Sequence, residues 1–493
     1  MKRSLKLIMI FCMICGLLTI AGCKPKDETE TENVDLSPIG NEYANYPFPQ
    51  QAKYVIDPKL PSDKTKAEID VMILSLFKQI LTTDLIIDVN GPQTKDGFRM
   101  VFRHYLEWEI EEKLIKVSHI NVSESQGYGM MMLAYMAGCE DKLNADSYKW
   151  IMGCDRLQDY FNAMLRTVLA FPSITGENNH LFTWELNGYP KDGKNKTGYK
   201  EIDGVKTAPF TMDPKGGDSA TDGDMDIIYS LLLADQQWGS EGAYNYKQFA
   251  LDMLESFWKY CVHKEYYTLL LGDWAENSDE AVYRDATRTS DFIISHLKVF
   301  ASVDKNHDWQ KVIDATYGVI KDIREAENEK GTNNGLLPDF VIRENDKWIV
   351  PVGEVLEGDE DGDYSYNACR IPWRLGTDYL LYGDTKIGNK SLAEYIIKPL
   401  DEFARTYTKG DMEILGPLHL NGKPLDWDDA ETFAPQFLVT AAGNGYDNEW
   451  VNQVWRYDGL NVYHGNNYGD YITIFSMLTA AGYYWLPMGE ISS

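Results

Sequence analysis

The sequence predicts an all-α protein in which an outer ring of helices surrounds an inner ring. Apolar residues recur at helical spacing in twelve segments between residues 64 and 484. Three of these segments, GMMMLAYMAG, DIIYSLLLAD and YITIFSMLTAAGYYW, are apolar nearly all round, so other helices must cover them on every side. Strand-like alternation is scarce and confined to short pieces such as FTWEL and KWIV. An elongated bundle or a helical solenoid is the competing arrangement.

The twelve predicted helices differ from one another in sequence, so a short-period repeat protein is not indicated. Their approximate bounds are Lys64–Ile87, Glu124–Gly138, Ala145–Leu169, Asp222–Trp238, Tyr246–Val262, Ser290–Val303, Asp308–Ala326, Asn367–Leu381, Ser391–Thr408, Asp429–Ala442, Asn448–Tyr457 and Gly469–Tyr484. Two long segments, Phe171–Ser219 and Asn328–Tyr366, lack helical spacing. Long loops inside a compact domain usually build a binding surface, and we expect that role for both.

The first 22 residues have the pattern of a secretory signal, with a basic start and an apolar stretch that ends in Ala21 and Gly22. The stretch TIAGC resembles a lipobox, with Cys23 as the acylated residue. Ordinary signal cleavage beside an incidental cysteine is the alternative. Because two acyl chains give stable anchoring where one is marginal, we expect an extracytoplasmic lipoprotein tethered to a membrane through Cys23.

The rest of the chain divides into an acidic spacer and one folded domain. Residues 23–48 are acidic and poor in large apolar side chains, which suits a solvated linker. No low-complexity stretch interrupts the sequence after that, so we expect a single domain over residues 49–488.

Charge and cysteine content exclude several classes of protein. The formal net charge of −29 disfavours nucleic acid as a partner and is compatible with a neutral or cationic polymer. Cys139, Cys154, Cys261 and Cys369 are scattered without CxxC spacing, which indicates neither a zinc site nor a disulfide framework. One disulfide bridge and four buried thiols remain the two alternatives for these cysteines.

The stretch SESQGYG places a carboxylate at the start of a buried helix. Ser123 is the expected N-cap and Glu124 the first helical residue, a position where the helix dipole alone favours an acid. Gly127 and Gly129 follow, although each glycine inside a helix costs about 1 kcal/mol relative to alanine. The two glycines therefore predict the close approach of a neighbouring backbone or a ligand.

A second group of acids, Asp222, Asp224 and Asp226, crowds the first turn of another apolar helix, with Ser219 or Thr221 as its expected cap. Dipole compensation does not require three carboxylates within five residues, and their mutual repulsion opposes folding. A catalytic or ligand-binding use of one of them is as well supported as dipole compensation.

A third group of acids lies in the loop before the helix that starts near Asn367. Its members are Glu357, Asp359, Glu360, Asp361 and Asp363. A solvated acidic loop is the simplest interpretation, and Arg370 and Arg374 in the following helix could pair with these acids.

Together the stretches SESQGYGMMMLAYMAG and ATDGDMDIIYSLLLADQQWG resemble glycoside hydrolase family 8, whose signatures are Ser-Glu-x-x-x-Tyr-Gly and Ala-Thr-Asp-x-Asp. LGDWAEN, RTSDFIISHL, GLLPDFV and YSYNACRIPWR support the resemblance, which extends from about Phe48 to Pro487. The resemblance implies an (α/α)6 barrel, with six inner and six outer helices and long substrate-binding loops. That architecture agrees with the twelve predicted helices.

The same resemblance implies roles for three carboxylates. Glu124 matches the general acid of the family, and Asp222 matches the aspartate that binds the sugar at the cleavage point. Many members have an aspartate as general base where this chain has Asn367. A subgroup resembling bacterial chitosanases and licheninases has asparagine there and takes its base from the loop just upstream. We therefore expect Glu357 as the base, with Asp359 and Glu360 in reserve.

Family members invert the anomeric carbon, which requires the acid and the base to lie roughly 6.5–9.5 Å apart with a water molecule between them. No metal or organic cofactor is implied. The residues expected to bind the sugar are Tyr128, Trp184, Trp274, Tyr366, Asn367, Arg370 and Trp373.

The expected substrate is a polysaccharide, and the leading hypothesis is an endo-acting hydrolase of β-1,4 linkages in cellulose-like or mixed-linkage glucans. Chitosan is the close rival, and xylan ranks third. A polysaccharide lyase and a non-catalytic sugar-binding lipoprotein are the alternatives from other classes. We expect the protein to act as a monomer.

Overall fold

The computed structural model describes residues 44–104, 119–145, 148–190, 194, 197–212, 216–444 and 448–488. These residues fall within one compact unit, Ser37–Ser493. The predicted signal segment and Cys23 lie outside the described residues, as does the predicted linker apart from residues 44–48. Within the described part of the chain, no helix is both long and apolar enough to cross a membrane.

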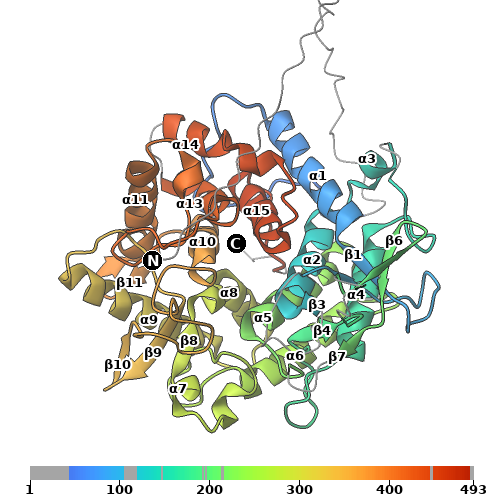
Figure 1. Cartoon of the computed structure of the whole chain (residues 1–493), viewed down its shortest axis with the longest axis horizontal. Helices are drawn as coiled ribbons and strands as arrows, with labels where there is room; N and C mark the ends of the chain where they lie inside the picture. The colour runs from blue at the N-terminus through green and yellow to red at the C-terminus, as the bar shows by residue number, and fades with distance from the viewer. Residues whose placement is uncertain are drawn as a thin grey trace, which may run out of the picture. The chain divides into compact units, whose positions relative to one another are not determined.

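Six helices of the described chain form a closed inner ring. They are α2 (Ser123–Tyr135), α5 (Thr221–Trp238), α8 (Ile294–Val303), α10 (Ile371–Tyr382), α13 (Phe437–Asn444) and α15 (Asn467–Ala480). Each packs against the next in chain order, and α15 packs against α2 to close the ring (Figure 1). Nearly every residue of α2, α5 and α15 is buried, as their lack of a polar face predicts.

Six further helices form the outer ring and alternate with the inner helices along the chain. They are α1 (Lys66–Thr83), α4 (Leu157–Ala170), α6 (Tyr246–Tyr260), α9 (Trp309–Glu329), α11 (Lys398–Thr408) and α14 (Asn448–Trp455). Each packs against an inner helix: α1 on α15, α4 on α2, α6 on α5, α9 on α8, and both α11 and α14 on α13. These helices bury one stripe each, which is typical of an amphipathic surface helix. The predicted (α/α)6 barrel is confirmed.

Short helices and strands occupy the connections between the barrel helices. The short α-helices are α3 (Glu140–Ala145), α7 (Ala281–Arg284) and α12 (Ala430–Phe433). The 3-10 helices are η1 (Ala275–Asn277), η2 (Thr289–Asp291), η3 (Ala368–Arg370), η5 (Met412–Ile414), η6 (Ala434–Gln436) and η7 (Asp458–Asn461), and η4 (Ala393–Ile397) is a π-helix that precedes α11.

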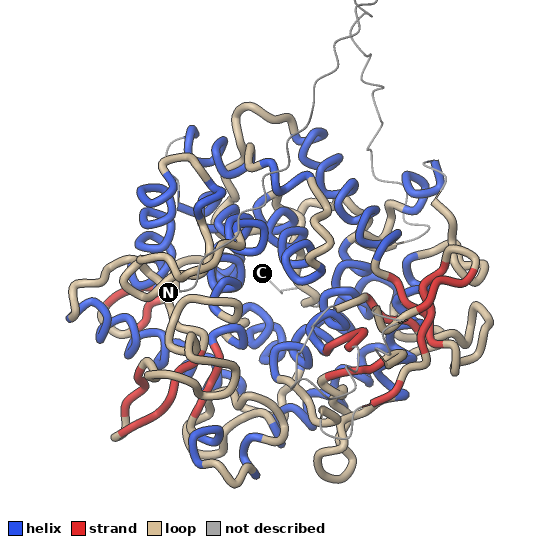
Figure 2. The backbone as a smooth tube through the Cα atoms, in the orientation of Figure 1, coloured by secondary structure: helices blue, strands red, loops and turns tan. Residues whose placement is uncertain are grey.

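The strands form small sheets that lie outside the helical ring (Figure 2). They are β1 (Leu85–Asp88), β2 (Met100–Phe102), β3 (His119–Val122), β4 (Glu185–Asn187), β5 (Lys200–Ile202), β6 (Val205–Ala208), β7 (Thr211–Met212), β8 (Ala286–Arg288), β9 (Phe340–Glu344), β10 (Lys347–Ile349), β11 (Lys386–Ile387) and β12 (Lys390–Ser391). The sheet orders are β2-β1-β6-β5, β3-β4-β7, β10-β9-β8 and β11-β12. The predicted strand-like pieces FTWEL and KWIV overlap β4 and β10.

All twelve predicted segments contain a helix, and the bounds differ where local backbone geometry intervenes. The helix predicted from Ala145 begins only at Leu157, because Met152 and Gly153 have positive φ angles that end any helix before them. The predicted caps are also wrong. Ser123 is the first residue of α2 rather than its N-cap, and Ala220 occupies the N-cap of α5.

Glycines let α2 approach α5 closely, as the sequence predicted for Gly127. A Cβ atom at Gly127 would lie 2.6 Å from the Cβ of Asp226, and one at Gly223 would lie 2.6 Å from the carbonyl carbon of Ser123. Gly129 faces the ring of Phe102 in the same way. The close neighbours of Gly127 and Gly129 are therefore protein groups.

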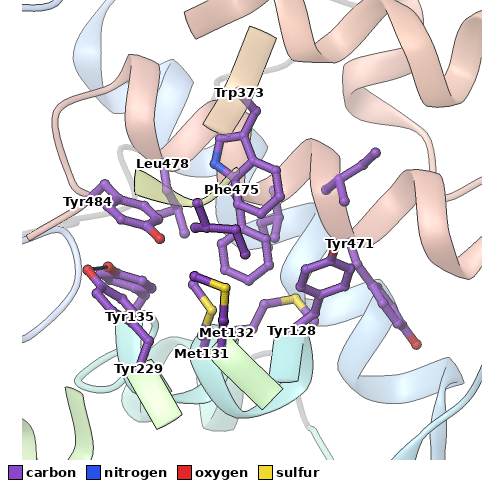
Figure 3. Packing of buried hydrophobic residues seen from close by; sticks show 14 of the residues in the cluster. Tyr128, Met131, Met132, Tyr135, Tyr229, Trp373, Tyr471, Phe475, Leu478 and Tyr484 are labelled. Carbon is purple, nitrogen blue, oxygen red and sulfur yellow. Dashed lines mark hydrogen bonds between the residues drawn. The ribbon is translucent and has the colours of Figure 1, made fainter. Parts of the chain in front are cut away.

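An aromatic cluster fills the middle of the inner ring (Figure 3). Trp373 stacks on Phe475 with ring centroids 5.2 Å apart, and Tyr128 packs against both. The four cysteines at 139, 154, 261 and 369 are free and buried. Within the described residues, no group of three histidine, cysteine or acidic side chains is placed to hold a metal ion.

Because Gly127 has no room for a methyl group, Gly127→Ala should lower the free energy of unfolding by about 1–3 kcal/mol through overpacking. Gly318→Ala is the matched control, since Gly318 lies in α9 with open space around it. This second substitution should raise stability by about 0.5–1 kcal/mol. Chemical denaturation measures both. Equal effects of the two substitutions would contradict the close packing of α2 on α5.

Candidate active site

A groove of about 950 Å³ lies over the N-terminal ends of the inner helices α2, α5, α10 and α15. Predicted site residues on its surface are Glu124, Trp184, Trp274, Glu357, Glu360, Tyr366, Asn367 and Arg370. Other lining side chains include His104, Asp218, Arg288, Asp339, Glu354, Asp361, Trp427, Asp429 and Tyr468. The positive ends of the helix dipoles therefore meet a surface rich in carboxylates.

Glu124 is the one residue of α2 that is not buried, with 19% of its side chain exposed to the groove. Arg370 donates a hydrogen bond of 2.7 Å from Nη1 to its Oε1 atom. Burial and the negative charge of Asp222 raise the pKa of Glu124 to about 7, against the opposing effect of Arg370 and Arg288. Glu124 therefore holds a proton up to nearly neutral pH, as a general acid must.

Asp222 lies beneath Glu124, buried at the second position of α5. It accepts hydrogen bonds from Arg370 Nη1 at 2.8 Å and from the backbone N–H of Gly223 at 2.9 Å. Burial alone would raise the pKa of Asp222, but Arg288 and Arg370 outweigh burial and lower it to about 2. The pKa values of two neighbouring carboxylates thus lie far apart, an arrangement typical of acid–base sites.

Glu357 faces the same groove from the loop before η3, with 40% of its side chain exposed. The Nδ2 atom of Asn367 donates to Glu357 Oε2 at 2.8 Å, and Arg288 Nη1 lies 3.5 Å from Glu357 Oε1. Asn367 Oδ1 in turn accepts from Arg370 Nη2 at 2.9 Å. A continuous chain of hydrogen bonds therefore connects Glu357 to Glu124 through Asn367 and Arg370.

The two reserve candidates for the base differ in position. Glu360 lines the groove, whereas Asp359 is exposed and is not among the lining residues. The next acid in the loop, Asp361, lines the groove but is buried and hydrogen-bonded to the loop backbone.

Arg288 is a site residue that the sequence reasoning missed. It ends β8, donates from Nη2 to the carbonyl of Leu271 at 3.0 Å, and lies 3.5 Å from Asp222 Oδ1. Arg288 and Arg370 thus both contact Asp222, and each also contacts one of the glutamates. The motif RTSDFIISHL contains Arg288, so an arginine inside a family motif was the available signal.

Asp339 fixes the start of the α10 segment at the floor of the groove. Its Oδ1 atom accepts from the backbone N–H of Ser365 at 2.9 Å and of Ala368 at 2.7 Å, on either side of Asn367. Burial raises the pKa of Asp339 to about 8, although those backbone donors oppose the rise. Asp339 lies in the motif GLLPDFV, and the sequence alone indicated no role for this residue.

Two of the predicted sugar-binding aromatics do not reach the groove. Tyr128 and Trp373 are each 1% exposed and belong to the aromatic core beneath the site (Figure 3). Their prediction as a sugar platform is wrong, because both face inward from inner helices. Tyr128 contributes instead through its hydroxyl, which accepts from Arg370 Nη1 at 3.2 Å.

The tryptophan and tyrosine rings on the groove surface come from loops, except Tyr468, which is the second residue of α15. Trp184, Trp274 and Tyr366 were expected there, and Trp427 and Tyr468 were not. Trp427 stands in the segment LDWDDAETF, where a lone tryptophan among acids was the only signal.

The second acidic group separates into one site residue and two structural ones. Asp226 pairs with both terminal nitrogens of Arg374, at 3.0 and 2.5 Å, and accepts from His296. Asp224 accepts from the backbone N–H of Phe182 and so holds the long loop over α5. Of the three aspartates in this group, only Asp222 contacts Arg370.

The chain is similar in sequence to known glycoside hydrolases. The family model described as Glycosyl hydrolases family 8 matches residues 201–413. A beta-glucanase from Niallia circulans is 30% identical over 442 residues, which cover 90% of this chain and 91% of that protein. An endoglucanase from Bacillus sp. (strain KSM-330) is 27% identical over 474 residues, which cover 95% of this chain and 88% of that protein.

A solved structure has the same fold. The apo structure of a beta-1,3-1,4-glucanase from Paenibacillus sp. X4 is 30% identical, covers 90% of this chain and 99% of that chain, and superposes with a TM-score of 0.72. The similarity extends over nearly the full length of both chains, and it confirms the resemblance carried by the motifs. The protein is therefore an enzyme of glycoside hydrolase family 8.

Proposed function

We propose that the protein is an inverting, endo-acting hydrolase of β-1,4 linkages in glucans. The observation that carries this proposal is the pair of carboxylates on one groove, Glu124 kept protonated by burial and Glu357 held by Asn367 and Arg288. Inverting hydrolysis requires such a pair, because an acid protonates the leaving oxygen while a base activates water on the opposite face of the sugar ring.

In the proposed reaction Glu124 gives its proton to the glycosidic oxygen as the bond from that oxygen to the anomeric carbon breaks. Glu357 takes a proton from a water molecule, whose oxygen forms the new bond on the opposite face of the ring and so inverts the anomeric carbon. Asp222, ionised at neutral pH, positions the substrate at the cleavage point through Arg370, which it holds beside Glu124.

The amide at Asn367 supports Glu357 as the base. Its Nδ2 donates to Glu357 while its Oδ1 accepts from Arg370, so the side chain uses both ends of the amide. An aspartate at 367 would place a carboxylate oxygen against Glu357 and disfavour the ionised form of one of them. The subgroup with asparagine at this position and its base in the upstream loop is therefore the assignment that we propose.

The relatives support a glucan as substrate, because their names describe a beta-glucanase, an endoglucanase and a beta-1,3-1,4-glucanase. The aromatic rings on the groove surface suit neutral sugar rings, which stack on apolar faces. Cellulose-like and mixed-linkage chains are both included in the proposal.

Chitosan is the second candidate, favoured by the acids around the groove. Asp218, Glu354, Glu360 and Asp429 line it in addition to the proposed catalytic pair. Burial and the charge of Asp273 raise the pKa of Asp218 to about 6, which is still below neutral pH, and an ionised carboxylate attracts ammonium groups.

A reducing-sugar assay on barley glucan, carboxymethylcellulose, chitosan and xylan tests the function. We expect the highest kcat/KM on a glucan and a loss of about 10³-fold in Glu124→Gln, because the leaving oxygen then lacks its proton donor. A β-glycosyl fluoride needs no such proton, so Glu124→Gln should keep most of its activity on that substrate. Full activity of Glu124→Gln on glucan would exclude Glu124 as the acid.

The same assay separates the three candidates for the base. Glu357→Gln should lose about 10³-fold on glucan and on the fluoride alike, because the water is then not activated. Asp359→Asn and Glu360→Gln, which change the same loop by the same loss of charge, should each stay within about threefold of the wild type. Mild and equal losses in all three variants would mean that the base lies elsewhere.

The pKa of Glu124 predicts the alkaline side of the pH profile. Because only the protonated form acts, kcat/KM should fall as the pH rises through about 7. Asp222 raises that pKa, so Asp222→Asn should move the alkaline limb of its residual activity to lower pH. A limb that stays in place or moves upward would show that another group sets it.

We also propose that the protein is extracytoplasmic and anchored to a membrane by acyl chains on Cys23, on the strength of the TIAGC sequence. Cys23→Ala should abolish incorporation of labelled fatty acid and release the protein from the membrane fraction. Cys154→Ala is the control, because Cys154 is buried in the folded domain. Equal labelling of the two variants would contradict the anchor.

A further inference from the structure

The carboxylate of Asp361 accepts hydrogen bonds from four consecutive backbone N–H groups of its own loop. Oδ2 accepts from Val355 at 2.8 Å, Leu356 at 2.8 Å and Glu357 at 3.1 Å, and Oδ1 accepts from Gly358 at 3.0 Å. Asp361 is 3% exposed, although Glu357 and Asp359 in the same loop are exposed. Successive N–H groups that converge on one anion form a concave backbone nest.

The nest is tied to the barrel through the backbone of Asp361. Its carbonyl accepts from the N–H of Phe340 at 2.8 Å, in β9. Phe340 pairs in register with Arg288 on β8, the arginine that faces the carboxylates of Glu357 and Asp222. The loop that carries Glu357 and the arginine that faces Glu357 are therefore both attached to strand β9.

We propose that Asp361 is a positioning residue, which fixes the Glu357 carboxylate at the distance where it can activate water. This inference rests on the proposed function, in which Glu357 is the general base. Three N–H groups converge on Oδ2 and leave that oxygen no free lone pair, and Oδ1 accepts the fourth, so the buried carboxylate is held by its own loop and is poorly placed to accept a proton from water. Asp361 lines the groove but its carboxylate is buried in the nest, so it acts through the backbone of Val355–Gly358.

Asp361→Asn removes this arrangement with little change in volume. The amide has one acceptor oxygen and an NH₂ group, which would face backbone N–H donors in either orientation. A displacement of the reacting group by about 1 Å lowers the rate about 10²-fold. We therefore expect kcat to fall about 10²-fold on glucan and on the β-glycosyl fluoride alike, with KM within about threefold of the wild type.

The control is Asp363→Asn, the same substitution two residues along the same loop. The carboxylate of Asp363 lies 3.0 Å from Nδ1 of His419 and does not enter the nest. This variant should keep kcat within about threefold. A loss in Asp363→Asn as large as in Asp361→Asn would overturn the proposal, because any loop acid would then have the same effect.

A double-mutant cycle separates positioning from general loosening of the fold. If Asp361 acts only through Glu357, the variant Asp361→Asn/Glu357→Gln is no slower than Glu357→Gln alone. Losses that multiply in the double variant would overturn the proposal, as would a kcat of Asp361→Asn close to that of the wild type. Wild-type activity of Glu357→Gln by itself would instead refute the assignment of the base, a separate and distinguishable failure.

Hydrogen exchange on the wild-type protein tests the nest without any variant. The amides of Val355, Leu356, Glu357 and Gly358 should exchange far more slowly than an exposed loop does, because each is bonded to a buried carboxylate. Exchange at the rate of an unstructured peptide would overturn the proposal even if Asp361→Asn did not fold.

Discussion

The guanidinium of Arg370 is the group on which the site depends. It is 2% exposed, and it bonds to Glu124, Asp222 and Asn367 at distances of 2.7–2.9 Å. A buried arginine cannot lose its charge, so it is tolerated only where carboxylates and dipoles compensate it. Asp222 supplies most of that compensation as a full negative charge. Glu124 can then keep its proton, because the negative charge of Asp222 already balances the positive charge of Arg370.

The ring of helices makes this arrangement possible. Four of the inner helices, α2, α5, α10 and α15, present their N-termini to the groove, and side chains at those ends come from segments far apart in sequence. Close packing of α2 on α5 through Gly127 and Gly223 brings Glu124 directly above Asp222. A bulkier residue at either glycine would separate the two helices and, with them, the two carboxylates. The fold and the difference in charge between Glu124 and Asp222 therefore have a common origin in helix packing.

The barrel could be predicted from sequence because the spacing of apolar residues shows which face of each helix is buried. A helix that is apolar on all sides, such as α5, must be covered by other parts of the protein on every side. The motifs likewise predicted Glu124 and Asp222, and the asparagine at 367 predicted the loop of Glu357; the structure places Glu124 and Glu357 on one groove and Asp222 against Arg370. The failures arose where contacts between distant segments decide the outcome. Nothing local distinguishes Asp222, which meets Arg370, from Asp226, which meets Arg374. Tyr128 and Trp373 lie close to site residues in the chain, but the geometry of their helices points both side chains into the core.

The hydrogen bond between Asn367 and Glu357 has a consequence for how such a site changes over evolutionary time. An acid at 357 and an amide at 367 form a matched pair, and the reverse pairing would serve equally well with the acid on the helix. Under the proposed assignment of Glu357 as the base, replacing one member alone leaves either two repelling acids or no base. A change from one arrangement to the other would then require both residues to change together.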